Sequence, residues 1–287
     1  MISVSESYRL CRQIARQKAK NFYYAFLLLP QDRMDPMCSI YAFMRHSDDV
    51  IDSNASSQRA DELLRWKEKV TLALEGISDD DPVLPAFADT VNRFSIPHHY
   101  FYELLDGVGM DLQKNRYQTF EELYQYCYRV ASVVGIVCLY IFGFKDQRAL
   151  KLAEATGIAF QITNILRDLE EDGRENRVYL PLEDLLKFHY SVEQLKEGVS
   201  DDHFRALFDF EIARARDYYQ KGEELVSLVN PECRRTLAAL TGIYRTLLDK
   251  IDRQRDQVFT KRIRLSIFEK LAVLFRSWRQ PVTAILP

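Results

Sequence analysis

The sequence contains few of the residues that interrupt helices, with 10 glycines and 9 prolines among 287 residues. This low content excludes a turn-rich all-β architecture and favours long helices. Apolar residues make up 47% of the chain and include 17 phenylalanines and 16 tyrosines. That supply is sufficient for a large core and for a cavity with aromatic walls, and we therefore expect an all-α protein.

The chain also lacks a surplus of positive charge, because its formal net charge is −3. Proteins that bind nucleic acid by neutralising phosphates carry a basic patch, so no nucleic-acid partner is expected. The five cysteines are scattered and include no CxxC pair. This arrangement fits reduced thiols in a cytoplasmic protein better than a disulfide framework or a zinc site.

Long apolar segments are absent as well. Residues 1–10 are polar and lack the apolar segment of a signal peptide. The longest nearly uncharged stretch is Val130–Phe144, which is shorter than the roughly 20 residues that span a bilayer. We expect it to be a core helix.

Apolar residues recur at spacings of three and four along most of the chain, which is helical periodicity. Three pairs have the spacing of a capping box at a helix start, namely Ser3–Glu6, Thr119–Glu122 and Ser191–Gln194. No repeat, low-complexity tract or flexible linker divides the chain, so we expect a single domain over residues 1–287. The pattern predicts helices at about 5–18, 20–28, 33–52, 59–75, 83–94, 98–113, 119–143, 147–172, 201–228, 232–255 and 264–278.

The first chemical signal is an acidic motif in the predicted helix 33–52. Asp48 and Asp52 lie four residues apart, so their carboxylates project from one helix face about one turn apart. Arg45 and Tyr41 lie on the preceding turns of that face, whereas Asp49 lies off it. Two like charges at this spacing repel each other, and a hard divalent cation would reverse that cost.

A second polar stripe occurs in the predicted helix 147–172. Gln161, Asn164, Asp168 and Asp172 follow one another at steps of three, four and four. The rest of this helix is apolar, and carboxylates on a buried element are costly without cations.

A single acidic pair is more often solvated surface charge than a site. Two such stripes favour a Mg²⁺ and diphosphate site, because Mg²⁺ prefers one or two carboxylates together with waters and phosphate oxygens. The expected metal ligands are Asp48, Asp52, Asn164, Asp168 and Asp172.

Three further segments accompany the acidic motifs. They are Phe22-Tyr-Tyr-Ala-Phe26-Leu-Leu-Leu-Pro30, Tyr126-Cys-Tyr-Arg-Val-Ala-Ser-Val-Val-Gly135 and Arg177-Val-Tyr-Leu-Pro181. With these segments the sequence resembles the squalene/phytoene synthase family of head-to-head trans-isoprenyl diphosphate synthases, from Tyr8 to about Leu274. Ser132 and the segment Val258–Leu265 are most similar to the bacterial presqualene diphosphate and squalene synthases of hopanoid pathways.

The resemblance implies a helical bundle around a central cavity and a Mg²⁺-dependent prenyltransferase reaction. Two farnesyl diphosphates would condense 1′-1 to presqualene diphosphate, on the route to squalene and hopanoids. The implied catalytic residues are Asp48, Asp52, Asp168, Asp172, Arg45 and Tyr126, with Tyr126 guiding proton removal. The implied substrate-binding residues are Tyr41, Phe22, Phe26, Gln161, Asn164 and Tyr244, and Phe43 is a further expected wall residue because π-faces stabilise a carbocation without attacking it.

Several alternatives stay open at this stage. The chain could be a complete squalene synthase that uses NADPH, or a dehydrosqualene or phytoene synthase of carotenoid synthesis. Bulky Phe22 and Phe26 favour C15 over C20 substrates. A non-catalytic helical assembly factor of the same fold would be expected to lose the aspartates, and a terpene cyclase would need a different second motif.

The C-terminal stretch Phe268–Arg279 mixes basic, apolar and tryptophan residues. It is a candidate for peripheral contact with the inner face of the cell membrane, with an ordinary packing helix as the alternative. If the reaction stops at presqualene diphosphate, hydride transfer falls to a separate oxidoreductase, which is the other expected partner.

Overall fold

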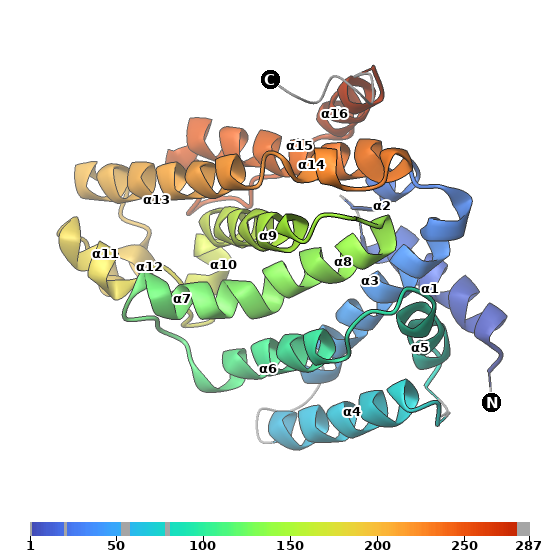
Figure 1. The fold of residues 1–287 in the computed structure, drawn as a ribbon. Coiled ribbons are helices and arrows are strands. Elements are labelled where there is room, and N and C mark those ends of the chain that lie inside the picture. The colour runs from blue at the N-terminus through green and yellow to red at the C-terminus, as the bar shows by residue number, and fades with distance from the viewer. Residues whose placement is uncertain (1, 20–21, 53–57, 78–80, 280–287) are drawn as a thin grey trace.

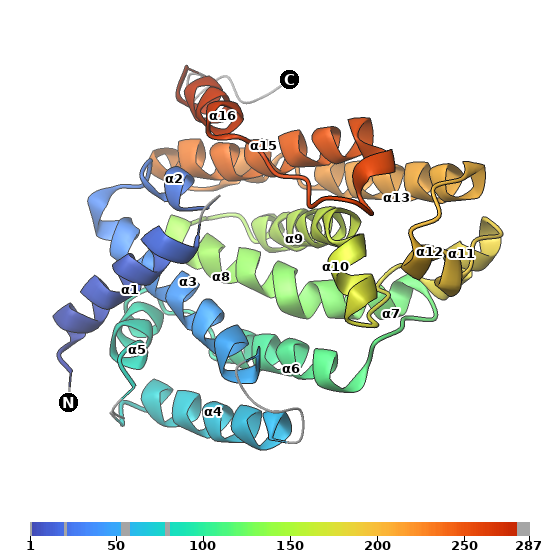
Figure 2. The ribbon, with the colours of Figure 1, turned by 180° about the vertical axis from the view of Figure 1, so that it is seen from behind.

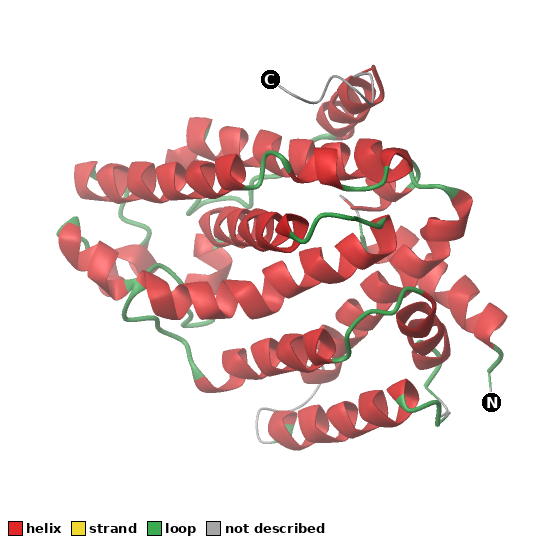
Figure 3. Ribbon diagram, viewed as in Figure 1, coloured by secondary structure: helices red, strands yellow, loops and turns green. Residues whose placement is uncertain are grey.

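A computed structural model of the chain describes residues 2–19, 22–52, 58–77 and 81–279. The described residues form helices joined by short loops, with two isolated β-bridges and no strand among them (Figure 3). This confirms the all-α prediction.

The helices of the first half are α1 (Val4–Lys18), α2 (Phe22–Phe26), α3 (Gln31–Asp52), α4 (Arg59–Leu74), α5 (Leu84–Arg93), α6 (His99–Gln113) and α7 (Phe120–Cys127). A π-helical turn, η1 (Tyr128–Ser132), joins α7 to α8 (Val133–Phe142). The second half contains α9 (Arg148–Arg167), α10 (Leu169–Arg174), α11 (Leu182–Lys187), α12 (Val192–Glu197), α13 (Asp202–Lys221), α14 (Leu225–Leu228), α15 (Pro231–Arg253), the 3₁₀ turn η2 (Arg255–Gln257) and α16 (Ile267–Arg279).

Helix α9 occupies the middle of the bundle. It packs against α13 and α15 on one side and against α7, η1 and α8 on the other (Figures 1 and 2). Helix α3 packs against α1, α4, α5 and α8, and α16 lies outermost, against α15. The two polar stripes of the sequence therefore lie on different helices. The first is on α3, and the second begins on the central helix α9 and ends in α10.

The buried apolar residues form two clusters. One cluster joins α1, α3, α4, α5, α6 and α8, and the other joins α7, α9, α13 and α15. Phe22 and Tyr128 are partly buried and pack against both clusters.

One helical run, Phe120–Phe142, is long and apolar enough to cross a membrane by length and composition alone. Half of its most apolar window is buried inside the protein, where α6 and α9 pack against it. This burial agrees with the core helix predicted for Val130–Phe144.

The π turn η1 is closely packed against two neighbouring helices. A Cβ atom on Gly157 of α9 would lie 2.4 Å from Ser132 Cα, and one on Gly107 of α6 would lie 2.7 Å from Arg129 Cβ. Both glycines therefore allow helices to approach η1 more closely than any other residue would. The Ser132 hydroxyl is fully buried and donates a hydrogen bond of 2.7 Å to the Glu154 carbonyl of α9.

Three predicted helices are broken in the structure, and two helices were missed. The predicted helix 119–143 contains the π turn, 147–172 is interrupted at Asp168, and 201–228 is interrupted at Gly222, where a Cβ atom would lie 2.2 Å from Thr156 Oγ1. The segment between the predicted helices 147–172 and 201–228 contains α11 and α12. Each has six residues, too few for apolar periodicity to indicate, and only the capping box at Ser191 marked the start of α12.

The capping boxes at Ser3 and Ser191 are formed as predicted. At Thr119 only half of the box forms. The hydroxyl accepts from the Glu122 amide, but the Glu122 carboxylate accepts from the Gln118 amide and from Lys114 instead of closing the box.

We predict that Gly157→Ala destabilises the protein by about 1–3 kcal/mol, because the added methyl group requires α9 to move away from η1. Urea unfolding followed by circular dichroism would measure the change. Gly173→Ala is the matched control, since the nearest atom to its Cβ is Lys196 Cα at 3.9 Å. Equal stability of the two variants would contradict the tight packing described for η1.

Candidate active site

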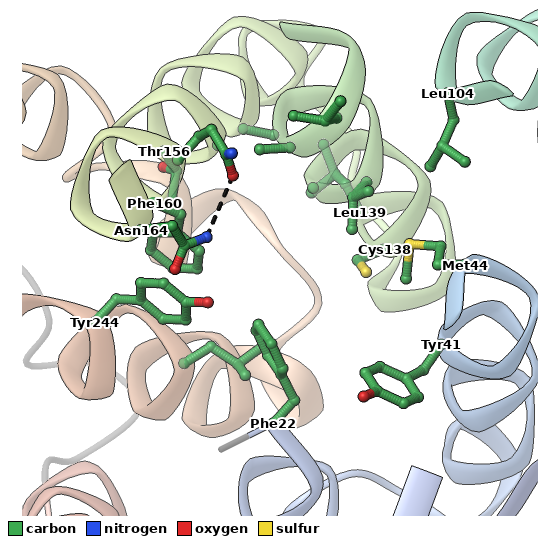
Figure 4. A pocket seen from close by; sticks show the side chains of 18 of the residues that line it. Phe22, Tyr41, Met44, Leu104, Cys138, Leu139, Thr156, Phe160, Asn164 and Tyr244 are labelled. Carbon is green, nitrogen blue, oxygen red and sulfur yellow. Dashed lines mark hydrogen bonds between the residues drawn. The ribbon is translucent and has the colours of Figure 1, made fainter. Parts of the chain in front are cut away.

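A cavity of about 430 Å³ lies between α2, α3, α8, α9 and α15 (Figure 4). Its wall is mostly apolar, with a few polar side chains from α3, α6 and α9. Tyr41 and Met44 of α3 lie across the cavity from Phe160 and Asn164 of α9. A mainly apolar cavity of this size with a few polar groups is typical of sites for small, greasy ligands.

Aromatic rings form one end of the cavity. Tyr244 of α15 stacks on Phe160 with ring centroids 4.0 Å apart, and Phe22 lies 5.6 Å from Tyr244 and 6.4 Å from Tyr41. Phe26 also lines the cavity, as does Tyr126. The sequence analysis missed Phe160, although it lies one turn from Asn164 on the same face of α9.

Phe43 was predicted to line the cavity, and the structure shows that it does not. It is fully buried and stacks on Phe87 at 4.0 Å, away from the cavity lining. Helix α3 is buried on two sides, and Phe43 lies two residues after Tyr41, which on a helix places it on roughly the opposite side.

The first acidic motif presents one face of α3 to the cavity. Tyr41, Arg45 and Asp48 all line it, and Asp48 is exposed at the rim. Arg45 pairs with Asp49, and its Nε atom is buried without a hydrogen-bond partner among the described residues. This N–H is therefore available to an anionic ligand. Asp52 is the last residue of α3, and its side chain lies outside the described part of the chain.

The first half of the second stripe also lines the cavity. Asn164 Nδ2 donates a hydrogen bond of 3.2 Å to Gln161 Oε1, drawn as the dashed line in Figure 4. The other amide atom, Asn164 Oδ1, is buried and has no hydrogen-bond partner in the described part of the chain. A buried oxygen without a partner is costly, and a cation or a donor on a ligand would satisfy it.

The second half of the stripe does not continue along the same face, which corrects the prediction of one straight helix. Asp168 ends α9 with φ −106° and ψ 14°, and it lies outside the cavity lining. Its carboxylate pairs with Arg167 and, at 2.9 Å, with Arg262. Both arginines neutralise a carboxylate that is only 14% exposed.

Asp172 lies one turn further on, in α10. Burial, and then the negative charge of Asp168, raise the pKa of Asp172 to about 7, and Arg177 acts in the opposite direction. The charged form of Asp172 is therefore poorly stabilised by the protein alone. A divalent cation beside Asp168 and Asp172 would favour it.

A second pocket, of about 400 Å³, adjoins the cavity and shares Tyr41 and Arg45 with it. Its lining is strongly basic and includes Lys18, Arg45, Arg167, Arg262, Arg264 and Lys270. Among the described residues that line it none is acidic, although Arg45 pairs with Asp49, and Arg167 and Arg262 pair with Asp168, outside the lining. The excess of positive charge suits a multiply charged anion. We name it the basic pocket. Arg262 and Arg264 belong to the segment Val258–Leu265, and neither was predicted to be a site residue.

A carboxylate that the sequence analysis missed lies at the cavity wall. Asp111 of α6 accepts hydrogen bonds from Tyr126 Oη at 3.0 Å and from Tyr179 Oη at 2.9 Å. Burial, and then the charge of Asp111, raise the pKa of Tyr126 well above its usual value. Tyr126 is thus a neutral phenol whose orientation is fixed by Asp111. Tyr179 belongs to the segment Arg177–Pro181, one of those that carry the family resemblance, and this was the sequence feature that could have indicated the site.

The donors around the cavity fit Mg²⁺ in kind, since Asp48 and Asn164 offer the hard oxygen atoms that this ion prefers. Within the described residues, no three His, Cys, Asp or Glu side chains converge on one point. Asp168 is directed toward arginines, so an ion shared with Asp48 or Asn164 requires that side chain to turn.

The comparisons with known proteins agree with this geometry. The chain is 36% identical to the 15-cis-phytoene synthase of Synechococcus elongatus over 96% of this chain and 93% of that protein. It is 38% identical to the phytoene synthase of Arthrospira platensis, covering 94% and 92%.

Solved structures give the same result. A dehydrosqualene synthase in complex with a ligand superposes with a TM-score of 0.89 at 29% identity, covering 96% of each chain. Squalene synthase HpnC from Alicyclobacillus acidocaldarius superposes with a TM-score of 0.82 at 29% identity, covering 88% of this chain and 95% of that one. The family model described as Squalene/phytoene synthase matches residues 15–269. The chain therefore belongs to the squalene/phytoene synthase family and is a prenyltransferase.

Proposed function

We propose that this enzyme joins two molecules of a C20 allylic diphosphate head to head and forms phytoene. The observation that carries the proposal is the aromatic cavity that meets the basic pocket at Tyr41 and Arg45. The prenyl chain of the substrate fits the apolar cavity, and its diphosphate fits the basic pocket. The relatives named phytoene synthases, 36–38% identical over nearly the whole chain, support the C20 substrate.

The first step is loss of diphosphate from one substrate, and the basic pocket stabilises the leaving group. Arg45, Lys18 and Arg264 are placed to balance its charge. Mg²⁺, held by Asp48, Asn164 and the acidic groups Asp52, Asp168 and Asp172, would supply further charge stabilisation.

The allylic cation then forms inside the cavity. Phe22, Tyr41 and Tyr244 present π-faces that stabilise positive charge, and the apolar wall excludes water that would capture the cation. The C2–C3 double bond of the second substrate attacks C1 of the cation, and loss of a proton closes a cyclopropane ring.

Tyr126 and Asp111 form the polar part of the wall in this chemistry. Because its pKa is raised, Tyr126 keeps its proton and is not itself the base. Its single O–H group is donated to Asp111, so the phenol is a fixed part of the wall, and the released diphosphate is left as the proton acceptor.

The second stage distinguishes the possible products. Phytoene arises by loss of the second diphosphate, rearrangement and loss of a proton, so it requires no hydride. NADPH and a partner oxidoreductase are then unnecessary, unlike in the squalene and presqualene diphosphate alternatives of the sequence analysis.

The structure weakens the argument from Ser132 for the presqualene diphosphate alternative. Ser132 lies outside the cavity lining, and its hydroxyl bonds the backbone of α9. A serine at this position is therefore a packing residue with no contact to the ligand space.

The C15 reaction remains the second candidate. Phe22 and Phe26 both line the cavity and shorten it at that end. The structural likeness to a dehydrosqualene synthase and to squalene synthase HpnC also favours it.

We predict that Asp48→Asn, Asp52→Asn, Asp168→Asn and Asp172→Asn each lower turnover by about 100-fold or more, because charge stabilisation of the leaving group is lost. Steady-state assays with Mg²⁺, and circular dichroism for the fold, measure both properties. Asp217→Asn is the matched control, since Asp217 pairs only with Lys221 on the exposed face of α13 in the described structure. Two of the four variants with near wild-type turnover would contradict the metal roles.

We predict that Asp111→Asn lowers turnover about 10- to 100-fold, since two phenols lose the carboxylate that orients them. Tyr179→Phe should cause a smaller loss, because Tyr126 keeps its bond to Asp111. Tyr190→Phe is the control, a buried tyrosine that bonds the Val199 carbonyl far from the cavity. Unchanged turnover of Asp111→Asn would remove Asp111 from the site.

Product analysis tests the substrate directly. Incubation with labelled geranylgeranyl or farnesyl diphosphate, each with and without NADPH, should yield phytoene from the C20 substrate with no effect of NADPH. Consumption of the C15 substrate alone, with release of a cyclopropyl diphosphate, would establish the presqualene diphosphate alternative instead.

A further inference from the structure

Helix α16 carries an apolar stripe that the rest of the described protein leaves uncovered. Its members are large side chains that are all exposed, with Phe268 exposed to 82% and Trp278 to 57%: Ile267, Phe268, Leu271, Phe275 and Trp278. At 100° per residue these five positions fall within about 100° of arc, so they form one continuous face.

The opposite face of α16 is firmly attached to the bundle. Val273 and Ser277 are buried, and Val273 packs on Gly242 of α15, where a Cβ atom would come within 2.8 Å. Lys250 of α15 bonds Glu269 at 2.8 Å, and Ser266 and Glu269 cap the start of the helix. The exposed stripe is therefore presented by an anchored helix.

The charge around the stripe is opposite in sign to that of the whole protein. Residues 261–276 contain five basic residues and one acidic residue, whereas the complete chain has a formal net charge of −3. Lys261 and Arg276 are exposed within this segment. An exposed apolar stripe with tryptophan and a basic surround is the pattern of helices that lie in the interface of an anionic bilayer.

The position of α16 also fits this role. Lys270 in its second turn lines the basic pocket, which meets the cavity at Tyr41 and Arg45. The helix that carries the stripe thus also lines the pocket that adjoins the ligand cavity. A hydrocarbon product formed inside the cavity is insoluble in water and must leave into an apolar phase.

A second copy of the chain is a poorer occupant of the stripe. A helix of 13 residues is about 20 Å long and about 10 Å wide, a footprint of about 200 Å². Stable protein–protein interfaces bury about 800 Å² on each partner.

We propose that the α16 stripe docks on the surface of an anionic lipid bilayer, with Phe268, Phe275 and Trp278 inserted among the lipids. Docking brings the basic pocket, which adjoins the cavity, close to the membrane, so that product passes directly into the bilayer. The reason for docking rests on the proposed function, but the docking itself is tested without turnover.

The test is co-sedimentation of the full chain with phosphatidylcholine vesicles, with or without about one third phosphatidylglycerol, at low and high ionic strength. We expect binding to the anionic vesicles that weakens at high ionic strength. The triple variant Phe268→Ser, Phe275→Ser, Trp278→Ser should lose about tenfold or more of the binding. Its turnover on detergent-dispersed substrate should stay at the wild-type value, which shows that the fold is intact.

Leu186→Ser is the matched control. Leu186 is exposed to 77% on α11, at the end of the bundle away from α16 (Figures 1 and 2), and its loss should leave binding unchanged. A variant that ends at Arg279 should also bind as the wild type does.

Three outcomes would overturn the proposal. They are no binding to anionic vesicles at low ionic strength, full binding by the triple variant, and a wild-type dimer in light scattering that the triple variant converts to monomer. Loss of binding on deletion of residues 280–287 would likewise overturn it, because the docking element would then be the tail. Failure of turnover on both prenyl diphosphates would reject the proposed function and leave the vesicle result intact.

Discussion

The structure depends on how negative charge is balanced at the edge of an apolar cavity. Asp48 of α3 lines the cavity, whereas Asp168, which caps α9, and Asp172 of α10 are partly buried outside its lining. Carboxylates in such places need cations, and in the described structure arginines supply them for Asp168. A raised pKa at Asp172 shows that this balance is incomplete. We propose that the same lack of balance prepares the site for a metal and a diphosphate.

The packing of the central helices determines where the cavity lies. Close contact of α9 and α6 with the π turn η1 requires glycine at positions 157 and 107. Val130 of the π turn lines the cavity, and so do Val134 and Gly135, which follow the turn. π turns are frequent at functional sites, and here one connects closely packed helices to the ligand cavity.

Much of the site follows from helical periodicity. Tyr41, Arg45 and Asp48 share a face of α3 because they lie three to four residues apart, and Gln161 and Asn164 share a face of α9 for the same reason. Helical periodicity applied strictly would also have excluded Phe43 from the predicted cavity wall and included Phe160 in it. The predicted helix at 33–52 agrees with α3 to within two residues.

The remaining parts of the site depend on tertiary contacts that local patterns do not contain. Asp168 pairs with Arg262, 94 residues away, and this pairing coincides with the break that directs Asp168 away from the cavity. A single aspartate such as Asp111 looks like surface charge until Tyr126 and Tyr179 are brought to it from two other segments. The basic pocket likewise collects Lys18, Arg45 and Arg264 from three distant parts of the chain.

The central claim is that the two acidic elements hold divalent cations together with a diphosphate. Its most direct test is an anomalous-difference map from crystals grown with Mn²⁺ and a non-hydrolysable thio-analogue of a prenyl diphosphate. The account predicts Mn²⁺ peaks at the cavity rim, in contact with Asp48 on one side and with Asn164, Asp168 or Asp172 on the other, and the diphosphate beside Arg45. A diphosphate bound in the cavity with Mn²⁺ absent from this rim would contradict the account.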